Sequence, residues 1–232
     1  MILKPPKGAM LNRGHPYARG LVCYWLMNEG AGNIVNDLSG NGSMGIITAG
    51  ATAPTWVAGK YGSALNFDGG DNINCGNNSS LNLSQFTFVA SVNINSQVSN
   101  AIVFAKHNAG TQGYFFQVGD GYVKAKFNNQ DQNYAIGTTL LTPGKTYHIA
   151  ATYDGVALKV YVNGVDDTVS SLVTDAAPTV HTGNFYFGQL YSGGLWQINS
   201  KINYGFVYNR ALSATEILNL YRSSFCMFEV DL

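Results

Sequence analysis

Charged residues are scarce in this sequence, and the two signs balance. Only 11% of the 232 residues are charged, with 13 acidic and 13 basic side chains. A chain without excess charge has no overall field that attracts nucleic acid or an anionic membrane. With 46% hydrophobic residues and 27 Gly, the composition instead favours a folded chain rich in strands and turns.

Cysteine is also scarce. The three residues Cys23, Cys75 and Cys226 are too few and too widely spread for a disulfide framework or a metal-ligand motif, so we expect buried free thiols. The sequence has no apolar run long enough to cross a membrane. Its first twenty residues lack the apolar region and the cleavage site of a secretory signal peptide. We therefore expect neither membrane insertion nor Sec export.

Residues for common catalytic motifs are missing as well. Glycoside hydrolases of β-sandwich type need paired carboxylates, yet the only glutamates are Glu29, Glu216 and Glu229, and no ExDxxE pattern occurs. Asp166 and Asp167 are adjacent and point to opposite faces of a strand. The four histidines form no HxH or HExxH motif, and neither GxSxG nor a phosphate loop occurs. From these absences we predict that the chain is not an enzyme.

Alternation of apolar and polar residues dominates what is present. It recurs along nearly the whole chain between Gly, Asn and Asp clusters, which is typical of half-buried antiparallel strands. The runs at 147–153 and 156–162 are separated by Asp154-Gly155 and predict a hairpin, with Asn163-Gly164 at the next turn. His148 alternates with the apolar residues of its run, so we expect it on the solvent side or bonded to a loop.

One helix is expected near the end of the chain. Ser213 and Glu216 form a capping box before an apolar stripe that begins at Ile217. We expect this helix to cover an end of the sandwich. The strands and the helix together predict an all-β, two-sheet antiparallel jelly-roll sandwich with one short C-terminal helix. We divide the chain into a basic N-terminal arm at 1–19, the sandwich at 20–223 and an apolar tail at 224–232.

Six stretches, in order, resemble the laminin-G-like jelly-roll domains of the concanavalin A-like lectin/glucanase superfamily. They are GLVCYWLMNEGAG at 20–32, DLSGNG at 37–42, GKYGSALNFDG at 59–69, TYHIAATYDG at 146–155, VYVNG at 160–164 and VYNRALSATEILNLY at 207–221. The resemblance implies the same sandwich. It implies little about function, because one fold serves many functions.

The resemblance also implies a structural calcium ion. In that family an Asp of the DxSGNG turn, nearby carbonyls and an Asp before the YNRAL motif commonly hold the ion. Asp37 matches the first position, whereas Asn203 stands at the second and supplies only an amide oxygen. The alternative is an Asx-type turn in which Asp37 caps backbone N–H groups.

Glycan binding is the function that the remaining residues favour. Lectin sites place an aromatic ring against the apolar face of a sugar and surround it with amide partners. The segments 127–137 and 188–200 have this composition. The candidate platforms are Tyr134, Tyr191 and Trp196, and the candidate polar partners are Asn129, Asp131 and Asn199. Alternatively, Trp196 belongs to the core and the amide-rich loops are ordinary surface.

The N-terminal arm suggests attachment to other proteins. It carries Lys4, Lys7, Arg13 and Arg19 and no acidic residue. We expect a phage virion surface protein, either a capsid decoration or a tail component, whose partners are virion proteins or its own copies and, in addition, cell-surface glycans. Such a protein is made in the host cytoplasm. The alternatives are an extracellular carbohydrate-binding or adhesion module and, least favoured, a degenerate glycoside hydrolase.

Overall fold

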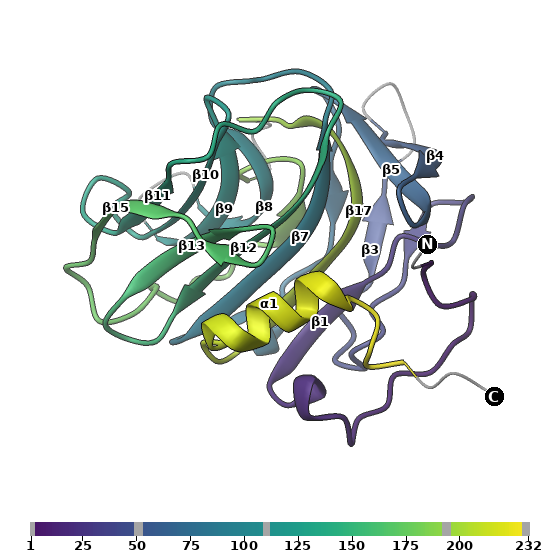
Figure 1. Cartoon of the computed structure of the whole chain (residues 1–232), viewed down its shortest axis with the longest axis horizontal. Coiled ribbons are helices and arrows are strands. Elements are labelled where there is room, and N and C mark those ends of the chain that lie inside the picture. Colours follow the sequence, from purple (N-terminus) through teal and green to yellow (C-terminus); the bar gives the residue numbers. More distant parts are fainter. Residues whose placement is uncertain (1–2, 49–52, 109–111, 192–195, 229–232) are drawn as a thin grey trace.

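The computed structural model describes residues 3–48, 53–108, 112–191 and 196–228. These residues form two antiparallel sheets packed face to face, with one α-helix beside them (Figure 1). The predicted two-sheet jelly-roll sandwich with one short C-terminal helix is therefore confirmed. Among the described residues, no helix is long and apolar enough to span a membrane.

The first sheet has eight strands. They are β1 (Leu21–Trp25), β4 (Thr55–Gly59), β5 (Gly62–Asp68), β7 (Phe86–Ile94), β12 (Thr146–Tyr153), β13 (Leu158–Val162), β14 (Val165–Asp166) and β17 (Asn199–Tyr208). Their order is β14-β13-β12-β7-β17-β5-β4, and β1 also pairs with β17.

The second sheet has nine strands. They are β2 (Ile34–Val35), β3 (Gly45–Ile47), β6 (Ile73–Asn74), β8 (Ala101–His107), β9 (Gly113–Gly119), β10 (Tyr122–Phe127), β11 (Tyr134–Gly137), β15 (Thr168–Leu172) and β16 (Phe185–Phe187). Their order is β15-β11-β10-β9-β8-β16-β6-β3-β2.

Local sequence signals explain the turns. The predicted hairpin is confirmed as β12–β13, and its Asp154 carboxylate accepts the backbone N–H groups of Val156 and Ala157 at 2.9 and 2.8 Å. Asn163 and Gly164 both have positive φ, 50° and 85°, which the turn into β14 requires and which Asn and Gly tolerate best.

The main core lies between the sheets and is rich in aromatic rings. Trp25 lies at its centre, stacked on Phe185 at 5.2 Å and edge-on to Phe187 at 5.0 Å between ring centroids. Its indole N–H donates to the Ser43 carbonyl at 2.7 Å, so the one polar atom of this buried ring is paired.

A second core lies on the outer face of the eight-stranded sheet. Helix α1 (Ala214–Arg222) covers this face with Ile217 and Leu220, rather than an end of the sandwich as the sequence suggested. Its capping box is confirmed, because Ser213 Oγ accepts the Glu216 N–H and the Glu216 carboxylate accepts the Ser213 N–H. Arg210 then holds this carboxylate at 2.7 Å and donates to the Arg19 carbonyl at 2.9 Å.

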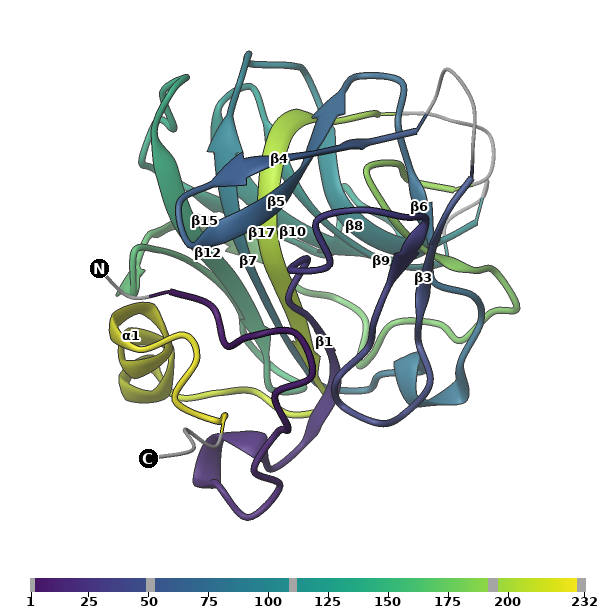
Figure 2. The ribbon, with the colours of Figure 1, turned by 90° about the vertical axis from the view of Figure 1, so that its right-hand side faces the viewer.

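The N-terminal arm and the C-terminal tail complete this second core, and Figure 2 shows them near each other beside α1. Leu11 forms an antiparallel bridge with Phe228, and the Asn12 N–H donates to the Met227 carbonyl at 2.8 Å. The two short 3-10 helices of the described residues are η1 (Pro16–Ala18) in the arm and η2 (Ser79–Leu81). Residues 1–2 and 229–232 of the predicted arm and tail lie outside the described residues.

Candidate functional site

The outer face of the nine-stranded sheet has no helix over its central strands. Alternation in β9 and β10 sends one set of side chains into the main core and the other set outward. The outward set includes Phe115 and Gln117 of β9 and Lys124 and Lys126 of β10. This face is where we place the candidate site.

Cross-strand register arranges the outward side chains in two rows. In the first row Lys126 lies between Phe115 of β9 and Tyr134 of β11. In the second row Lys124 lies between Gln117 and Ile136. Directly paired side chains on one face of an antiparallel sheet have Cβ atoms about 5 Å apart, so each row is a continuous surface.

An aromatic cluster lies at the β8–β9 side of this surface. The rings of Phe115 and Trp196 meet at 5.8 Å between centroids and an interplanar angle of 63°. Tyr191 and Trp196 are both half-buried and pack on a small cluster made by Ile102, Ala105, Phe115 and Leu190. Trp196 has φ of 59°, a strained conformation for a non-glycine residue, and strain of this kind gathers at functional sites.

Two buried side chains on this face, Gln117 and His107, have polar atoms without a hydrogen-bond partner. Gln117 is 0% exposed, and both ends of its amide are unpaired. His107 is 6% exposed, and its Nδ1 donates to the Asn108 carbonyl at 2.6 Å, while Nε2 has no hydrogen bond of good geometry. The His107 ring meets Phe115 edge-on at 5.3 Å. Unpaired buried polar atoms are costly and rare, which marks this cluster as unusual.

Glycine shapes the same region. A Cβ atom at Gly119 would lie 2.8 Å from Gln117 Nε2 and 3.0 Å from Lys124 Nζ. The Gln117 amide and the Lys124 ammonium therefore both lie over Gly119. Lys124 forms an ion pair with the exposed Asp120 at 3.0 Å.

The structure brings together most of the glycan-binding residues that the sequence suggested. Tyr134 lies in the first row of the outer face, and Tyr191 and Trp196 form its aromatic cluster. Asn129 and Asp131 lie in the β10–β11 loop beside this row, where the Asp131 N–H donates to Asn129 Oδ1 at 3.2 Å.

Asn199 does not join this group. It begins β17 in the other sheet, where its amide donates to the Asp68 carbonyl at 3.3 Å and accepts from Asn95 at 3.1 Å. Sequence reasoning also missed Phe115, Gln117 and His107. The alternation in GYFFQVG and YVKAKF could have revealed the outward set, but not that these polar atoms lack partners.

Asp37 and Asn203 do not fit one calcium site. The Asp37 carboxylate accepts three backbone N–H groups, from Tyr24 and Ser39 at 3.0 Å and from Ser43 at 2.9 Å. Asn203 Oδ1 instead accepts the Lys60 N–H at 3.0 Å. The Asp37 carboxylate and the Asn203 amide oxygen therefore accept from different backbone N–H groups. The contacts of Asp37 are those of an Asx-type turn. Within the described ranges, no group of three or more His, Cys, Asp or Glu side chains could hold a metal ion.

His148 is buried rather than on the solvent side as the sequence predicted. It is 2% exposed and lies beneath helix α1, with Tyr221 at 5.7 Å and Tyr204 at 6.5 Å between ring centroids. Both faces of strand β12 are covered, one by the other sheet and one by helix α1. The alternation of apolar and polar residues in this strand therefore does not place His148 in solvent. Burial lowers the pKa of His148 to about 3, with a smaller contribution from the Lys60 ammonium.

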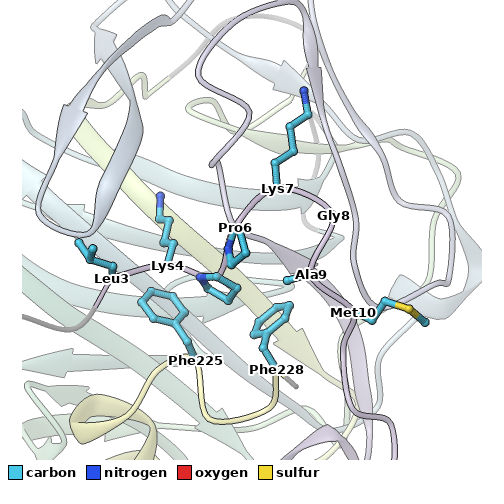
Figure 3. A pocket seen from close by; sticks show the side chains of 10 residues that line it. Leu3, Lys4, Pro6, Lys7, Gly8, Ala9, Met10, Phe225 and Phe228 are labelled. Atoms are coloured by element: carbon cyan, nitrogen blue, oxygen red, sulfur yellow. The ribbon is translucent and has the colours of Figure 1, made fainter. Parts of the chain in front are cut away.

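A groove of about 630 Å³ lies between the N-terminal arm and the C-terminal tail (Figure 3). The rings of Phe225 and Phe228 face the arm, while Lys7 points away from them. Lys4 is not available at this surface, because its ammonium donates to the carbonyls of Met27, at 3.1 Å, and Ser63. Burial lowers the pKa of Lys4 to about 7, and Glu29 opposes the shift. The other basic arm residues Lys7, Arg13 and Arg19 are exposed.

Comparison of the sequence with models of known protein families identifies the family of this chain. A family model described as the concanavalin A-like lectin/glucanases superfamily matches residues 67–218, more than half of the chain. The chain belongs to this superfamily, as its resemblance to laminin-G-like domains suggested. No curated protein matches the sequence.

Solved structures with the same fold come from proteins that act on or bind other molecules. Domain 4 of AbnA, a GH43 extracellular arabinanase from Geobacillus stearothermophilus solved with arabinotriose, is 18% identical, with a TM-score of 0.68 over 87% of this chain and 98% of that one. The binding domain of Paraclostridial Mosquitocidal Protein 1 is 18% identical, with a TM-score of 0.70 over 90% of this chain and 53% of that one.

A sialidase from Trypanosoma rangeli, solved with sialic acid, is 20% identical, with a TM-score of 0.61 over 90% of this chain. The chain spans 34% of the length of this sialidase. At these identities the likeness shows the fold.

These neighbours correct the prediction that the chain is not an enzyme. They include parts of a GH43 arabinanase and of sialidases, so the fold occurs within glycoside hydrolases. The prediction relied on one arrangement of paired carboxylates on a strand. The small number of Glu residues therefore does not exclude enzymatic activity.

Proposed function

We propose that the chain is a carbohydrate-binding β-sandwich domain that holds a glycan on the outer face of its nine-stranded sheet. The observation that carries this proposal is the gathering of three half-buried aromatic side chains, Tyr134, Tyr191 and Trp196, around the Phe115–Lys126 pair on one outer face. Sugar hydroxyls both donate and accept hydrogen bonds, so the half-buried Asn129 and the exposed Asp131 beside these rings suit a bound glycan.

The aromatic rings support the same proposal. Tyr134, Tyr191 and Trp196 are half-buried, so part of each side chain faces solvent. The C–H face of a pyranose or furanose packs well on such rings, while its hydroxyls reach the polar groups between them. The arabinotriose in the arabinanase domain and the sialic acid in the sialidase structure show that proteins containing this fold bind sugars.

A glycan array followed by calorimetry on the bound sugars tests the proposal. We expect Tyr134→Ala and Trp196→Ala each to weaken binding about tenfold or more, since aromatic anchors dominate binding energy. Tyr221→Ala is the matched control, because Tyr221 is a 37% exposed tyrosine on helix α1, away from the site. Melting curves establish that each variant is folded. Undiminished binding by both site variants would overturn the proposal.

A second candidate function is that of a phage virion surface protein, either a capsid decoration or a tail component. The groove between the arm and the tail supports it, because Leu3 and Met10 are exposed apolar residues beside the exposed Lys7. A virion protein or another copy of this chain is the proposed partner, and the virion surface the proposed location. An extracellular carbohydrate-binding or adhesion module is the alternative location for the glycan-binding function.

Mass spectrometry of purified particles tests the second candidate. We expect the chain in the particles and expect the double variant Met10→Asp with Lys7→Glu to lower its incorporation. Deletion of residues 1–19 is unsuitable as a test, because Leu11 and Tyr17 pack in the second core and Lys4 is hydrogen-bonded inside the molecule. Absence of the chain from particles contradicts this candidate and leaves the glycan-binding proposal intact.

A further inference from the structure

Lys126 lies at the centre of the proposed glycan surface without an ionic partner. It is half-buried between Phe115 and Tyr134, and none of the described residues forms a hydrogen bond or an ion pair with its ammonium group. The three ion pairs among the described residues involve Lys124, Lys159 and Arg210. Lys126 thus differs from its neighbour Lys124 on the same face.

The surroundings of Lys126 disfavour its positive charge. Burial lowers the pKa of Lys126, and the Lys124 ammonium adds to the effect, while Asp131 in the adjoining loop opposes it. A half-buried cation beside a second cation is most stable when an anion lies against it, because a charge-assisted hydrogen bond then replaces lost hydration. The nearest acids do not supply one, since Asp120 pairs with Lys124 and Asp131 is exposed in its loop.

Two neighbouring lysines on one face of a strand are unusual in a chain with so few charged residues. Charged residues are 11% of the sequence and the net charge is zero, yet two lysines occupy successive outward positions of one short strand. Both project into rows that also contain aromatic or amide side chains. The surface therefore combines stacking platforms, amide groups and two cations.

We propose that the glycan bound at this site is acidic, with its carboxylate or sulfate group held by Lys126 between Phe115 and Tyr134. This inference rests on the proposed glycan-binding function and names the class of sugar. Lys124 stays paired with Asp120, and the rings of Tyr134 and Trp196 pack against the sugar.

Matched probes that differ only in charge test the inference. One pair is an oligogalacturonide and its methyl ester, and the other is a sulfated galactan oligosaccharide and its desulfated form, neither of which carries a carboxylate. We expect the chain to bind at least one acidic member about tenfold more tightly than its neutral partner at 50 mM salt, since one charge-assisted contact has about this effect. The two pairs distinguish a carboxylate from a sulfate. The preference shrinks at 500 mM salt because the charges are then screened.

Variants of two lysines assign the effect to a residue. Lys126→Met removes the preference for the acidic member over the neutral one, while Lys126→Arg retains the preference. Lys159→Met on strand β13 is the control and leaves both affinities unchanged, because Lys159 lies in the other sheet, paired with Asp166. Melting curves confirm that the variants are folded.

The outcomes separate this inference from the proposed function. Equal binding of the charged and neutral members, or a full preference that survives in Lys126→Met, overturns the acidic ligand while leaving glycan binding in place. Failure to bind any glycan, charged or neutral, overturns both proposals.

Discussion

The outer faces of the two sheets differ in how they are covered. On the eight-stranded sheet, helix α1, the arm and the tail form a second core, in which the hydroxyls of Tyr24, Tyr204 and Tyr208 are hydrogen-bonded. Tyr24 donates to the Ser224 carbonyl at 2.7 Å, and Tyr204 shares a hydrogen bond with Ser224 Oγ at 2.8 Å. On the nine-stranded sheet, the outward side chains of β9–β11 include half-buried rings, a lysine without an ionic partner and an unpaired amide.

This difference separates stability from binding. A buried face with satisfied polar groups contributes apolar burial and needs no ligand. A face that keeps unpaired buried polar atoms loses stability unless a ligand satisfies them. The one exception on the covered face is His148, whose ring nitrogens both lack partners.

The largest effect is expected from truncation on the covered face. Leu220 of helix α1 is 0% exposed, so Leu220→Ala removes buried methyl groups and leaves a cavity. We expect a loss of about 2–5 kcal/mol in the free energy of unfolding, measured by urea denaturation. Ile136→Ala on the half-exposed second row of the other face should cost about 1 kcal/mol. Equal losses at the two positions would break the comparison between the faces.

Acid should weaken the covered face through His148. Its pKa is about 3 in the folded chain and about 6.5 when unfolded, so the unfolded chain binds the proton first as pH falls. This contribution to stability is complete above pH 6.5 and is lost as pH falls towards 3. At pH 5 the loss is about 2 kcal/mol relative to pH 8. We expect the free energy of unfolding of His148→Leu, measured by urea denaturation, to change less than that of the wild type between pH 8 and pH 5. An unchanged slope contradicts a neutral, buried His148.

The DLSGNG turn offers a smaller test of what holds the loops together. Asp37→Ala leaves three backbone N–H groups without their acceptor, and we expect a loss of about 1–2 kcal/mol in stability. A chelator should leave the melting temperature of the wild type unchanged, because three backbone N–H groups already occupy both oxygens of this carboxylate. A drop in melting temperature with the chelator, reversed by calcium, contradicts this arrangement.

The smallest stability effect is expected at Gln117. Gln117→Met keeps the length of the side chain and removes the unpaired amide, so stability should stay the same or rise by up to about 1 kcal/mol. A clear loss of stability would show that the amide has partners in the folded chain.

Much of the fold follows from local signals in the sequence. The β12–β13 hairpin, the Asn163-Gly164 turn and the capping box of helix α1 depend on residues close together in the chain, and all three are confirmed. The position of helix α1 was not predictable in this way. It depends on the second core, which is built from the arm, the tail and strands β1, β12 and β17.

The candidate site was only partly predictable for the same reason. Tyr134, Tyr191 and Trp196 were found from composition, but their shared face depends on sheet order and register. The sequence grouped Asn199 with Trp196 because they are only three residues apart. The chain enters strand β17 of the other sheet at Asn199, so the two side chains lie on different sheets. Neither the unpaired amide of Gln117 nor the burial of His148 has a signal in the sequence, since both depend on contacts between distant strands.

Mapping of amide chemical shifts by NMR during titration with a bound oligosaccharide tests the central claim most directly. The account predicts shifts in strands β9, β10 and β11 and at the Trp196 indole, with helix α1 and the residues of the arm and tail unaffected. Shifts confined to the groove between Leu3–Met10 and Phe225–Phe228, or to the face beneath helix α1, would contradict it.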